Sequence, residues 1–417
     1  MKIKHIKVDN FKSLVDFGLP LAKFNCIVGL NGSGKSTVLQ FFDFLSQQVQ
    51  GDLKGWLDKR HWKSNDINSK LTQKSNISFE ILLEDAENTE ILWNASFNRS
   101  SLSCTSERVV WNGNLMLKVE EGHYSIKGDK SAVKGGYGKP ETGNHNETKI
   151  DSFGSLSDTK MSGRITFDYQ GSLMSQIKES QLPTNLLQLK KFIGEIDAFD
   201  LLSPELLRQR TREAGNSLGL GGERLSAFLY EMSEGKRAKI LEKMTQCYPA
   251  LKGIDISAMQ SGWKKLTFKE NFQKHSIKTE ARHVADGFLR LLAIFAQLSK
   301  KQSFLLLDEI ENGINPELIE FLMDSLVDAP LQITVTTHSP MILNYIEDEV
   351  AIKGVVYLYK DKNGKTQAVR LFDIPSLYKK LTVMGPGEVY EDTLLSQLDD
   401  EIMILKDVCK SSEKGIL

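Results

Sequence analysis

A glycine-rich segment near the N-terminus has the composition and spacing of a phosphate-binding loop. Residues 29–36 read GLNGSGKS and fit the pattern G-x-x-x-x-G-K-[ST], between an apolar run at 24–28 and the helix-like run STVLQFFDFLSQQV. The glycines let successive backbone N–H groups point at phosphate oxygens, next to a helix N-terminus. The residues expected to bind the nucleotide are Gly29, Asn31, Gly32, Ser33, Gly34, Lys35, Ser36 and Thr37.

Two residues of this loop have side chains suited to MgATP. Lys35 is expected to neutralise the β- and γ-phosphates, and Ser36 to offer its hydroxyl to Mg²⁺. The alternative is a glycine-rich turn that happens to contain Lys-Ser. The flanking strand and helix patterns favour the nucleotide site, and so the sequence predicts ATP and Mg²⁺ as ligands.

An acidic pair follows the short apolar run FLLL at 304–307. A strand buried on both faces presents its C-terminal end to the ligand in an α/β sheet. Asp308 fits the magnesium shell, and Glu309 is the candidate general base for the attacking water. An acid pair that only caps the strand is the alternative, which the phosphate-binding loop disfavours.

A histidine ends a second β-branched run, QITVTTHSP, which follows a helix-like segment. A neutral imidazole at a strand end is suited to hydrogen-bond the γ-phosphate or the attacking water. We therefore expect His338 to act beside Glu309 and Lys35 in catalysis, although a lone histidine is usually structural.

Together these motifs resemble the ABC-type ATPases of the SMC, RecF and OLD kind. The closer resemblance is to the "AAA family ATPase" branch of bacterial anti-phage defence systems, which has ABC-type motifs despite its label. The residues that carry it are the loop at 29–37, DEIENGINP at 308–316 and THSP at 337–340, within the core segments 1–48 and 262–345.

The resemblance implies a head-to-tail dimer in which a signature segment of one subunit completes the ATP site of the other. The matching segment is VADGF at 284–288, with Asp286 and Gly287 expected to act in trans. The signature of this branch resembles S-D-G, and Ala285 stands at the serine position. The hydrogen bond from that serine hydroxyl to the phosphate, which Ala285 cannot make, is worth about 1.5 to 3 kcal/mol. Asp286 and Arg290 either compensate for it or are a helix cap and a solvent-exposed base.

Other site residues are implied by the resemblance alone. Gln170 is a candidate magnesium ligand, with a surface glutamine as the equal alternative. Lys12 and Ser13 are expected near the nucleotide. Glu311, Asn312 and Asn315 are expected in a loop that faces the other subunit.

The predicted fold is α/β, an ABC-type P-loop core with an inserted antiparallel β lobe and a helical lobe. Residues 1–170 are expected to form the first core half with a strand pair at 3–8 and 24–28, a β lobe over 77–124 and a mobile loop at 127–163. A strand RITFDY, a helical lobe over 171–261, the second core half over 262–345 and a partner-docking extension over 346–417 follow. A sustained heptad pattern is absent, which argues against a long coiled coil.

Composition limits the partners and the compartment. Lysine and arginine total 53 against 54 acids, and so only a local patch would bind nucleic acid. KGWLDKRHWK at 54–63 and RQRTR at 208–212 are the candidate DNA or RNA contacts, with solvated helix faces as the alternative. Four widely spaced cysteines and the lack of a long apolar run indicate a cytoplasmic protein without a membrane span.

These observations predict a homodimeric ATPase that acts as a timed switch on a separately encoded effector, in anti-phage defence. No nuclease is evident, because only about 80 residues follow His338 and they lack a spaced acidic cluster. The alternatives are an ATP-held scaffold that sequesters an effector with little turnover, and a RecF-like DNA-repair ATPase.

Overall fold

A computed structural model of the chain describes residues 1–128, 160–199, 202–212, 217–393, 398, 401, 402 and 404. It contains two compact units, each assembled from stretches that are distant in the sequence. Unit 1 comprises Met1–Ala22, Asn31–Asp197 and Leu358–Ala368, and unit 2 comprises Lys23–Leu30, Ala198–Tyr357 and Val369–Leu417.

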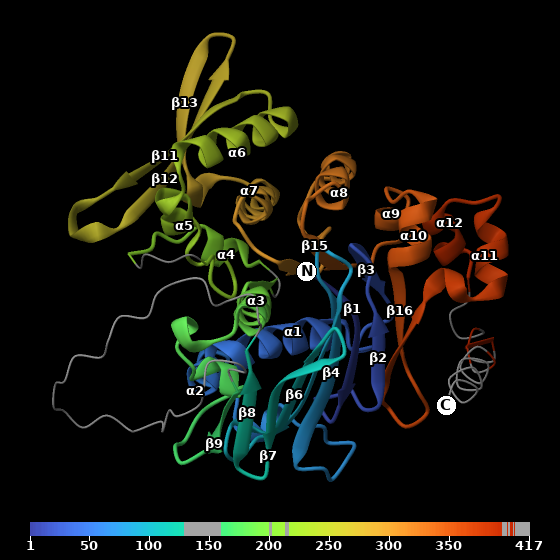
Figure 1. Cartoon of the computed structure of the whole chain (residues 1–417). Helices are drawn as coiled ribbons and strands as arrows, with labels where there is room; N and C mark the ends of the chain where they lie inside the picture. The colour runs from blue at the N-terminus through green and yellow to red at the C-terminus, as the bar shows by residue number, and fades with distance from the viewer. Residues whose placement is uncertain are drawn as a thin grey trace. The chain divides into compact units, whose positions relative to one another are not determined.

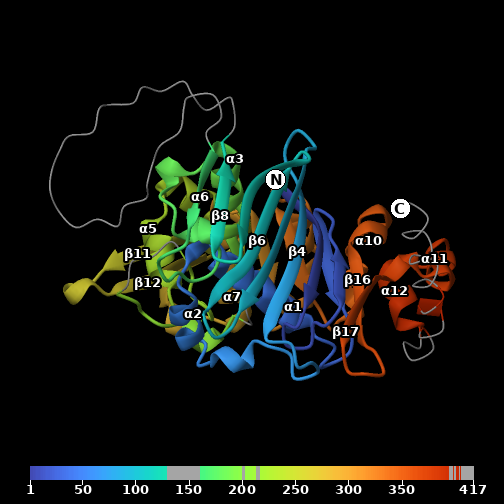
Figure 2. The same cartoon turned by 60° about the horizontal axis from the view of Figure 1, so that its bottom comes forward.

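Unit 1 contains an eight-stranded antiparallel sheet in the order β2-β1-β4-β5-β6-β7-β8-β9. Alternate residues of its strands are buried, as in β5, because only one face packs on the core. Figure 2 shows β4, β6 and β8 as successive alternate strands of this sheet. The strands are β1 Lys2–Asp9, β2 Phe17–Pro20, β4 Asn76–Glu84, β5 Glu90–Asn98, β6 Ser103–Trp111, β7 Asn114–Glu120, β8 His123–Lys127 and β9 Lys160–Arg164.

Helix α1 (Lys35–Gln50) covers the buried face of this sheet (Figure 1). Aromatic side chains fill the interface, with the ring of Phe44 5.1 Å from that of Phe97 on β5 and the ring of Phe41 6.2 Å from that of Phe79 on β4. This packing fixes the helix that begins at Lys35. The other helices of the unit are α2 Leu53–Lys59 and α3 Thr184–Gly194.

The central sheet of unit 2 has the order β10-β14-β15-β3-β16-β17, and the boundary between the units falls within β10, β16 and β17. Its inner strands β14, β15 and β3 are parallel and fully buried, as predicted from their apolar runs. The strands are β3 Phe24–Val28, β10 Ile196–Phe199, β14 Phe304–Leu307, β15 Gln332–Thr336, β16 Val355–Lys360 and β17 Thr366–Arg370. The helices of the unit are α4 Pro204–Leu207, α5 Leu225–Glu231, α6 Glu234–Cys247, α7 Asp286–Leu298, α8 Ile319–Val327, α9 Pro340–Leu343, α10 Asp348–Gly354, α11 Pro375–Leu381 and α12 Pro386–Glu391.

A separate antiparallel sheet of three strands lies between α6 and α7 in the sequence. It consists of β11 (Leu251–Ala258), β12 (Lys264–Phe272) and β13 (His275–Glu280). β12 and β13 lie within the range 262–345 that was expected to form the second half of the core, but they belong to this separate sheet and not to the central one.

Several other expectations differ from the structure. The runs at 3–8 and 24–28 are strands, but they belong to different sheets and do not pair. The stretch expected to be helical also contains β10 and β11. Of the expected mobile loop 127–163, residue 127 lies in β8 and residues 160–163 lie in β9. Residues 165–169 of RITFDY are not a strand. Residues 129–159 of that loop lie outside the described residues, as do most of residues 394–417 of the expected partner-docking extension.

Helix length bears on two further expectations. The longest helix in the described part of the chain is α1, with 16 residues, and so a long coiled-coil arm is absent there. Within the same residues, none of the helices combines the length and the apolar character that crossing a bilayer requires.

Candidate functional site

The phosphate-binding loop leads into α1 through a backbone conformation that favours glycine. Gly34 is the N-cap of α1 and has a φ of 113°, in the left-handed region. A Cβ built on Gly34 would lie 2.4 Å from Thr366 Oγ1, so a larger residue does not fit. No side chain caps α1, and the N–H groups of its first turn therefore suit an anion such as phosphate.

Thr366 holds this loop from a distant part of unit 1. Its Oγ1 lies 2.8 Å from the carbonyl oxygen of Ser33 and 2.8 Å from Ser13 Oγ, and its N–H donates to Ser13 O at 2.9 Å. A threonine hydroxyl has one proton, so Thr366 can donate to Ser33 while it accepts from Ser13. Thr366 is fully buried. The predicted proximity of Ser13 to the loop thus has a specific structural link.

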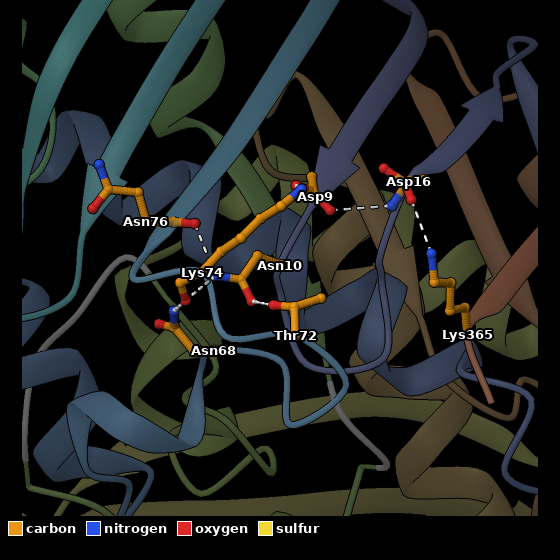
Figure 3. A network of polar contacts seen from close by, with 8 residues as sticks. All are labelled: Asp9, Asn10, Asp16, Asn68, Thr72, Lys74, Asn76 and Lys365. Atoms are coloured by element: carbon orange, nitrogen blue, oxygen red, sulfur yellow. Dashed lines mark hydrogen bonds and ion pairs between the residues drawn. The ribbon is translucent and has the colours of Figure 1, made fainter. Parts of the chain in front are cut away.

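A polar network fixes the turn that carries Ser13 (Figure 3). Lys365 donates to Asp16 at 2.9 Å, and the Lys365 ammonium lowers the pKa of the Asp16 carboxyl. Asn10 Nδ2 donates to the carbonyl oxygens of Lys74 and Asn76 at 2.7 and 2.8 Å. These contacts tie the end of β1 to the start of β4 and to the residue before Thr366.

The loop also contains a buried hydroxyl that suits a ligand. Ser33 is 4% exposed, and its Oγ has no hydrogen-bond partner in the described part of the chain. Such groups are rarely left unsatisfied in native proteins. The residues of the loop therefore fit a phosphate group.

Lys12 was also predicted to lie near the nucleotide. Its ammonium group donates to Gln40 Oε1 at 2.8 Å and lies 3.4 Å over the ring of Trp62.

In unit 2 three parallel strands end at one edge of the central sheet. Asp308 follows β14, Thr337 and His338 follow β15, and Gly29 follows β3. The N–H of Thr337 donates to Ile27 O at 3.1 Å, next to the residue where β3 ends. The start of the phosphate-binding loop, Asp308 and His338 therefore share this edge, as the sequence predicts.

Thr336 orients the acidic pair. Its hydroxyl makes a short hydrogen bond with Asp308 Oδ1, and the N–H of Glu309 donates to Thr336 Oγ1 at 2.9 Å. Glu309 has a φ of 47°, in the left-handed region. For a non-glycine residue this conformation costs about 1 to 3 kcal/mol, and such strain is concentrated at functional sites.

Glu309 and His338 face each other. Glu309 Oε1 lies 3.8 Å from His338 Nε2, and Glu309 Oε2 accepts from Asn312 Nδ2 at 3.1 Å. The backbone N–H of His338 donates to Glu311 Oε1 at 2.8 Å. A water molecule could thus lie within hydrogen-bond reach of both the carboxylate and the imidazole.

The predicted signature segment begins α7. Ala285 is the N-cap and makes no side-chain cap bond, while Arg208 forms an ion pair with Asp286 and donates to Val284 O at 2.8 Å. A Cβ built on Gly287 would lie 2.2 Å from Gly313 O, so α7 closely approaches the loop after β14.

Arg290 is 6% exposed, and so the solvent-exposed alternative was wrong. It donates to Asn312 O at 2.6 Å and lines a pocket with Asp308 and Glu309. Burial lowers the pKa of the Arg290 guanidinium, which Asp286 and Glu309 oppose.

Gln170 and the two basic segments have contacts within the chain. Gln170 Oε1 accepts from Lys54 N at 2.9 Å at the start of α2, which gives its carbonyl a structural partner. Trp56 is 4% exposed and donates to Asp43, which also pairs with Arg60. Arg208 and Arg210 pair with Asp286 and Glu280. These groups are therefore committed to internal contacts.

Comparisons with known proteins match this chain to ATPase domains. A model of the AAA ATPase domain matches residues 1–191, and a model described as "AAA domain, putative AbiEii toxin, Type IV TA system" matches residues 156–344. A solved SMC head bound to the C-terminal winged-helix domain of ScpA has a TM-score of 0.53 at 14% identity, over 92% of this chain and 100% of that one. The two models describe ATPase domains and together match residues 1–344, and the fold resembles that of an SMC head.

One curated relative adds detail. An OLD nuclease from Thermus scotoductus is 39% identical over 54 residues, which are 13% of this chain and 10% of the nuclease. The likeness to the SMC head extends over the whole head, and at 14% identity it concerns the fold of the ATPase domain. The α/β ABC-type architecture expected from the motifs is thereby confirmed.

Three residues of the site were missed in the sequence. Thr336 stands directly before Thr337-His338, and its position in QITVTTHSP was the available signal. Thr366 and Arg208 had none, since each contacts residues that are distant in the sequence.

Proposed function

We propose that this chain is a magnesium-dependent ATPase that dimerises around two ATP molecules and controls a separate effector protein in anti-phage defence. The observation that carries the enzymatic part is the arrangement at the end of β14. Asp308 is oriented by Thr336, and Glu309 is held in a strained conformation 3.8 Å from His338.

Each group has a distinct role in the proposed reaction. In this proposal the loop N–H groups and Lys35 would bind the phosphates, and Ser36 and Asp308 would hold Mg²⁺. When bound, Mg²⁺ neutralises phosphate charge. Glu309 accepts a proton from a water molecule while the oxygen of that water forms a bond to the γ-phosphorus. The bond between the γ-phosphorus and the β–γ bridging oxygen breaks, which leaves ADP and phosphate. His338 hydrogen-bonds the water or the γ-phosphate.

The dimer is the proposed source of timing. The backbone N–H groups at the N-terminus of α7, including those of Asp286 and Gly287, would bind the γ-phosphate held by a second copy, and hydrolysis would release it. The defence role is supported by the description of the matched domain, which mentions a toxin and a toxin–antitoxin system. The SMC head captured with a ScpA domain supports a search for a protein partner.

Steady-state ATP hydrolysis tests the proposal. Glu309→Gln is expected to lower kcat by about 100-fold or more, because a general base contributes roughly 10² to 10⁴. Glu317→Gln, an exposed glutamate in the same segment, is the matched control and should leave kcat unchanged. Glu309→Gln should also trap an ATP-dependent dimer in analytical ultracentrifugation, and Lys35→Ala should not form it.

A second function has one observation in its favour. Ala285 leaves α7 without a side-chain cap and without the serine hydroxyl of the related signature. An ATP-held scaffold that sequesters an effector would need little turnover. If the wild type binds ATP but hydrolyses it no faster than Glu309→Gln, this scaffold is the better account.

A further inference from the structure

The three-stranded sheet of unit 2 is a basic segment within a nearly neutral chain. Residues 251–283 contain seven lysines and arginines against three acids, while the whole chain has a net charge of −1. In Figure 1 the hairpin of β12 and β13 projects past α6. A local positive patch of this kind attracts anionic partners.

One face of the hairpin carries the lysines. Lys269 on β12 is directly opposite Lys278 on β13 in the strand register, and like charges in such a pair destabilise a sheet. Asp255 neutralises Lys269 at 2.8 Å. Lys278, and Lys274 in the turn, have no ion pair among the described residues, and both are exposed. Two cations are thus available to bind phosphates.

The opposite face of the hairpin has exposed apolar groups near its tip. Phe272 and Ile277 are 50% and 47% exposed, and Phe272 is directly opposite the exposed His275. Further along β12 the same face is buried, because Phe268 packs 4.8 Å from Phe288 of α7. Edge lysines alone would serve to prevent strand pairing, but that purpose does not require an exposed phenylalanine.

We propose that the β12–β13 hairpin binds single-stranded nucleic acid. The rings of Phe272 and His275 on one face stack on bases, and the nucleic-acid backbone passes over the tip at Lys274 to Lys278 on the other face, so that both lysines contact phosphates. Aromatic and cationic groups together bind single strands with little sequence preference. The basic segments at 54–63 and 208–212 fit this purpose less well, because Trp56 is buried and Arg60, Arg208 and Arg210 are paired with acids. The inference does not rest on the proposed ATPase activity.

Fluorescence anisotropy on the full chain tests the inference, with a labelled single-stranded oligonucleotide and the matching duplex as probes. The double variant Lys274→Gln/Lys278→Gln should weaken binding and lower the slope of log K against log salt by about 1.4, since each phosphate contact on a single strand contributes about 0.7. The control Lys362→Gln/Lys379→Gln removes the same charge from exposed lysines elsewhere and should leave both quantities unchanged.

Base stacking is tested separately. Phe272→Ala should weaken single-strand binding about tenfold, while Tyr378→Ala, at a residue 51% exposed, should have no effect. Lys35→Ala should bind as the wild type does, so failure of the ATPase proposal leaves this one standing. The inference is overturned if the wild type binds neither probe, if both lysine pairs weaken binding equally, if Phe272→Ala has no effect, or if poly-glutamate competes as well as the oligonucleotide.

Discussion

Thr366 Oγ1 lies 2.8 Å from the carbonyl oxygen of Ser33, within the loop that leads into α1. The same hydroxyl contacts Ser13, and the residue is fully buried. One side chain thus links the phosphate-binding loop to the turn after β1. The loop is expected to depend on this link for the conformation in which its N–H groups converge.

Thr366→Val is expected to lower ATP affinity, because it keeps the shape and removes both hydrogen bonds. Each such bond contributes about 0.5 to 1.5 kcal/mol, and so the Kd should rise by roughly 5-fold to more than 100-fold. Thr366→Ser retains the hydroxyl and should remain close to the wild type. Titration with a fluorescent ATP analogue measures the difference. Equal Kd values for the valine and serine variants would show that the hydroxyl does not matter.

Ala285→Ser is expected to strengthen the ATP-dependent dimer. The new hydroxyl can cap α7, worth about 1 kcal/mol, and can also reach a γ-phosphate presented by a second copy. Ala285→Asp is the matched control, since it caps the helix equally well but places a negative charge toward the phosphate. Sedimentation with ATP should show a tighter dimer for serine and a weaker one for aspartate. Similar behaviour of the two variants would mean that only capping changed.

Arg208→Ala is expected to weaken ATP-dependent dimerisation and hydrolysis more than it weakens folding. The Arg208 side chain is 28% exposed, and that of Asp286 is 49% exposed, so solvent screens their attraction. Its second contact, to Val284 O, positions the chain just before α7. A double-mutant cycle with Asp286→Ala, read by kcat and by thermal unfolding, tests the coupling. If the two changes add independently in kcat, Arg208 does not act through Asp286.

Glu107 is expected to make unit 1 less stable as the pH rises. Burial raises the pKa of its carboxyl above 4.5, although Ser172, the N–H of Leu173 and Trp93 donate hydrogen bonds to it. Since the folded-state pKa exceeds the unfolded one, the stabilisation is complete below about pH 4.5 and is lost as the pH rises through the folded-state value.

The measurement is the free energy of unfolding against pH for Glu107→Gln. The difference from the wild type should vary with pH by up to about 1.4 kcal/mol per unit. Glu90→Gln, at an exposed position of the same sheet, should give a curve parallel to the wild type. A parallel curve for Glu107→Gln would contradict the expectation.

Short-range patterns accounted for much of the fold. The apolar runs of β3, β14 and β15 and the glycine-rich loop are contiguous in the sequence, so their elements and the shared strand edge were predictable. Strand pairing was not, because β1 alternates equally well whether its neighbour is β3 or β4. The pairing depends on contacts over more than 70 residues, such as Val8 with Phe79.

The supports of the site were hidden for the same reason. Ser33 and Thr366 are 333 residues apart, and Arg208 and Asp286 are 78 apart. A threonine in a hairpin and an arginine in a basic run have no local mark of such roles. The interpretation of RQRTR as a nucleic-acid contact rested on its charges alone. In the structure Arg208 and Arg210 are paired with Asp286 and Glu280.

The left-handed conformation of Glu309 has a consequence for how this position responds to selection. Glycine and asparagine adopt that conformation more readily, so a library varied at codon 309 and sorted for thermal resistance should enrich them. Sorted for ATP turnover, the same library should return glutamate. The residue that the backbone prefers and the residue that the proposed chemistry needs are different.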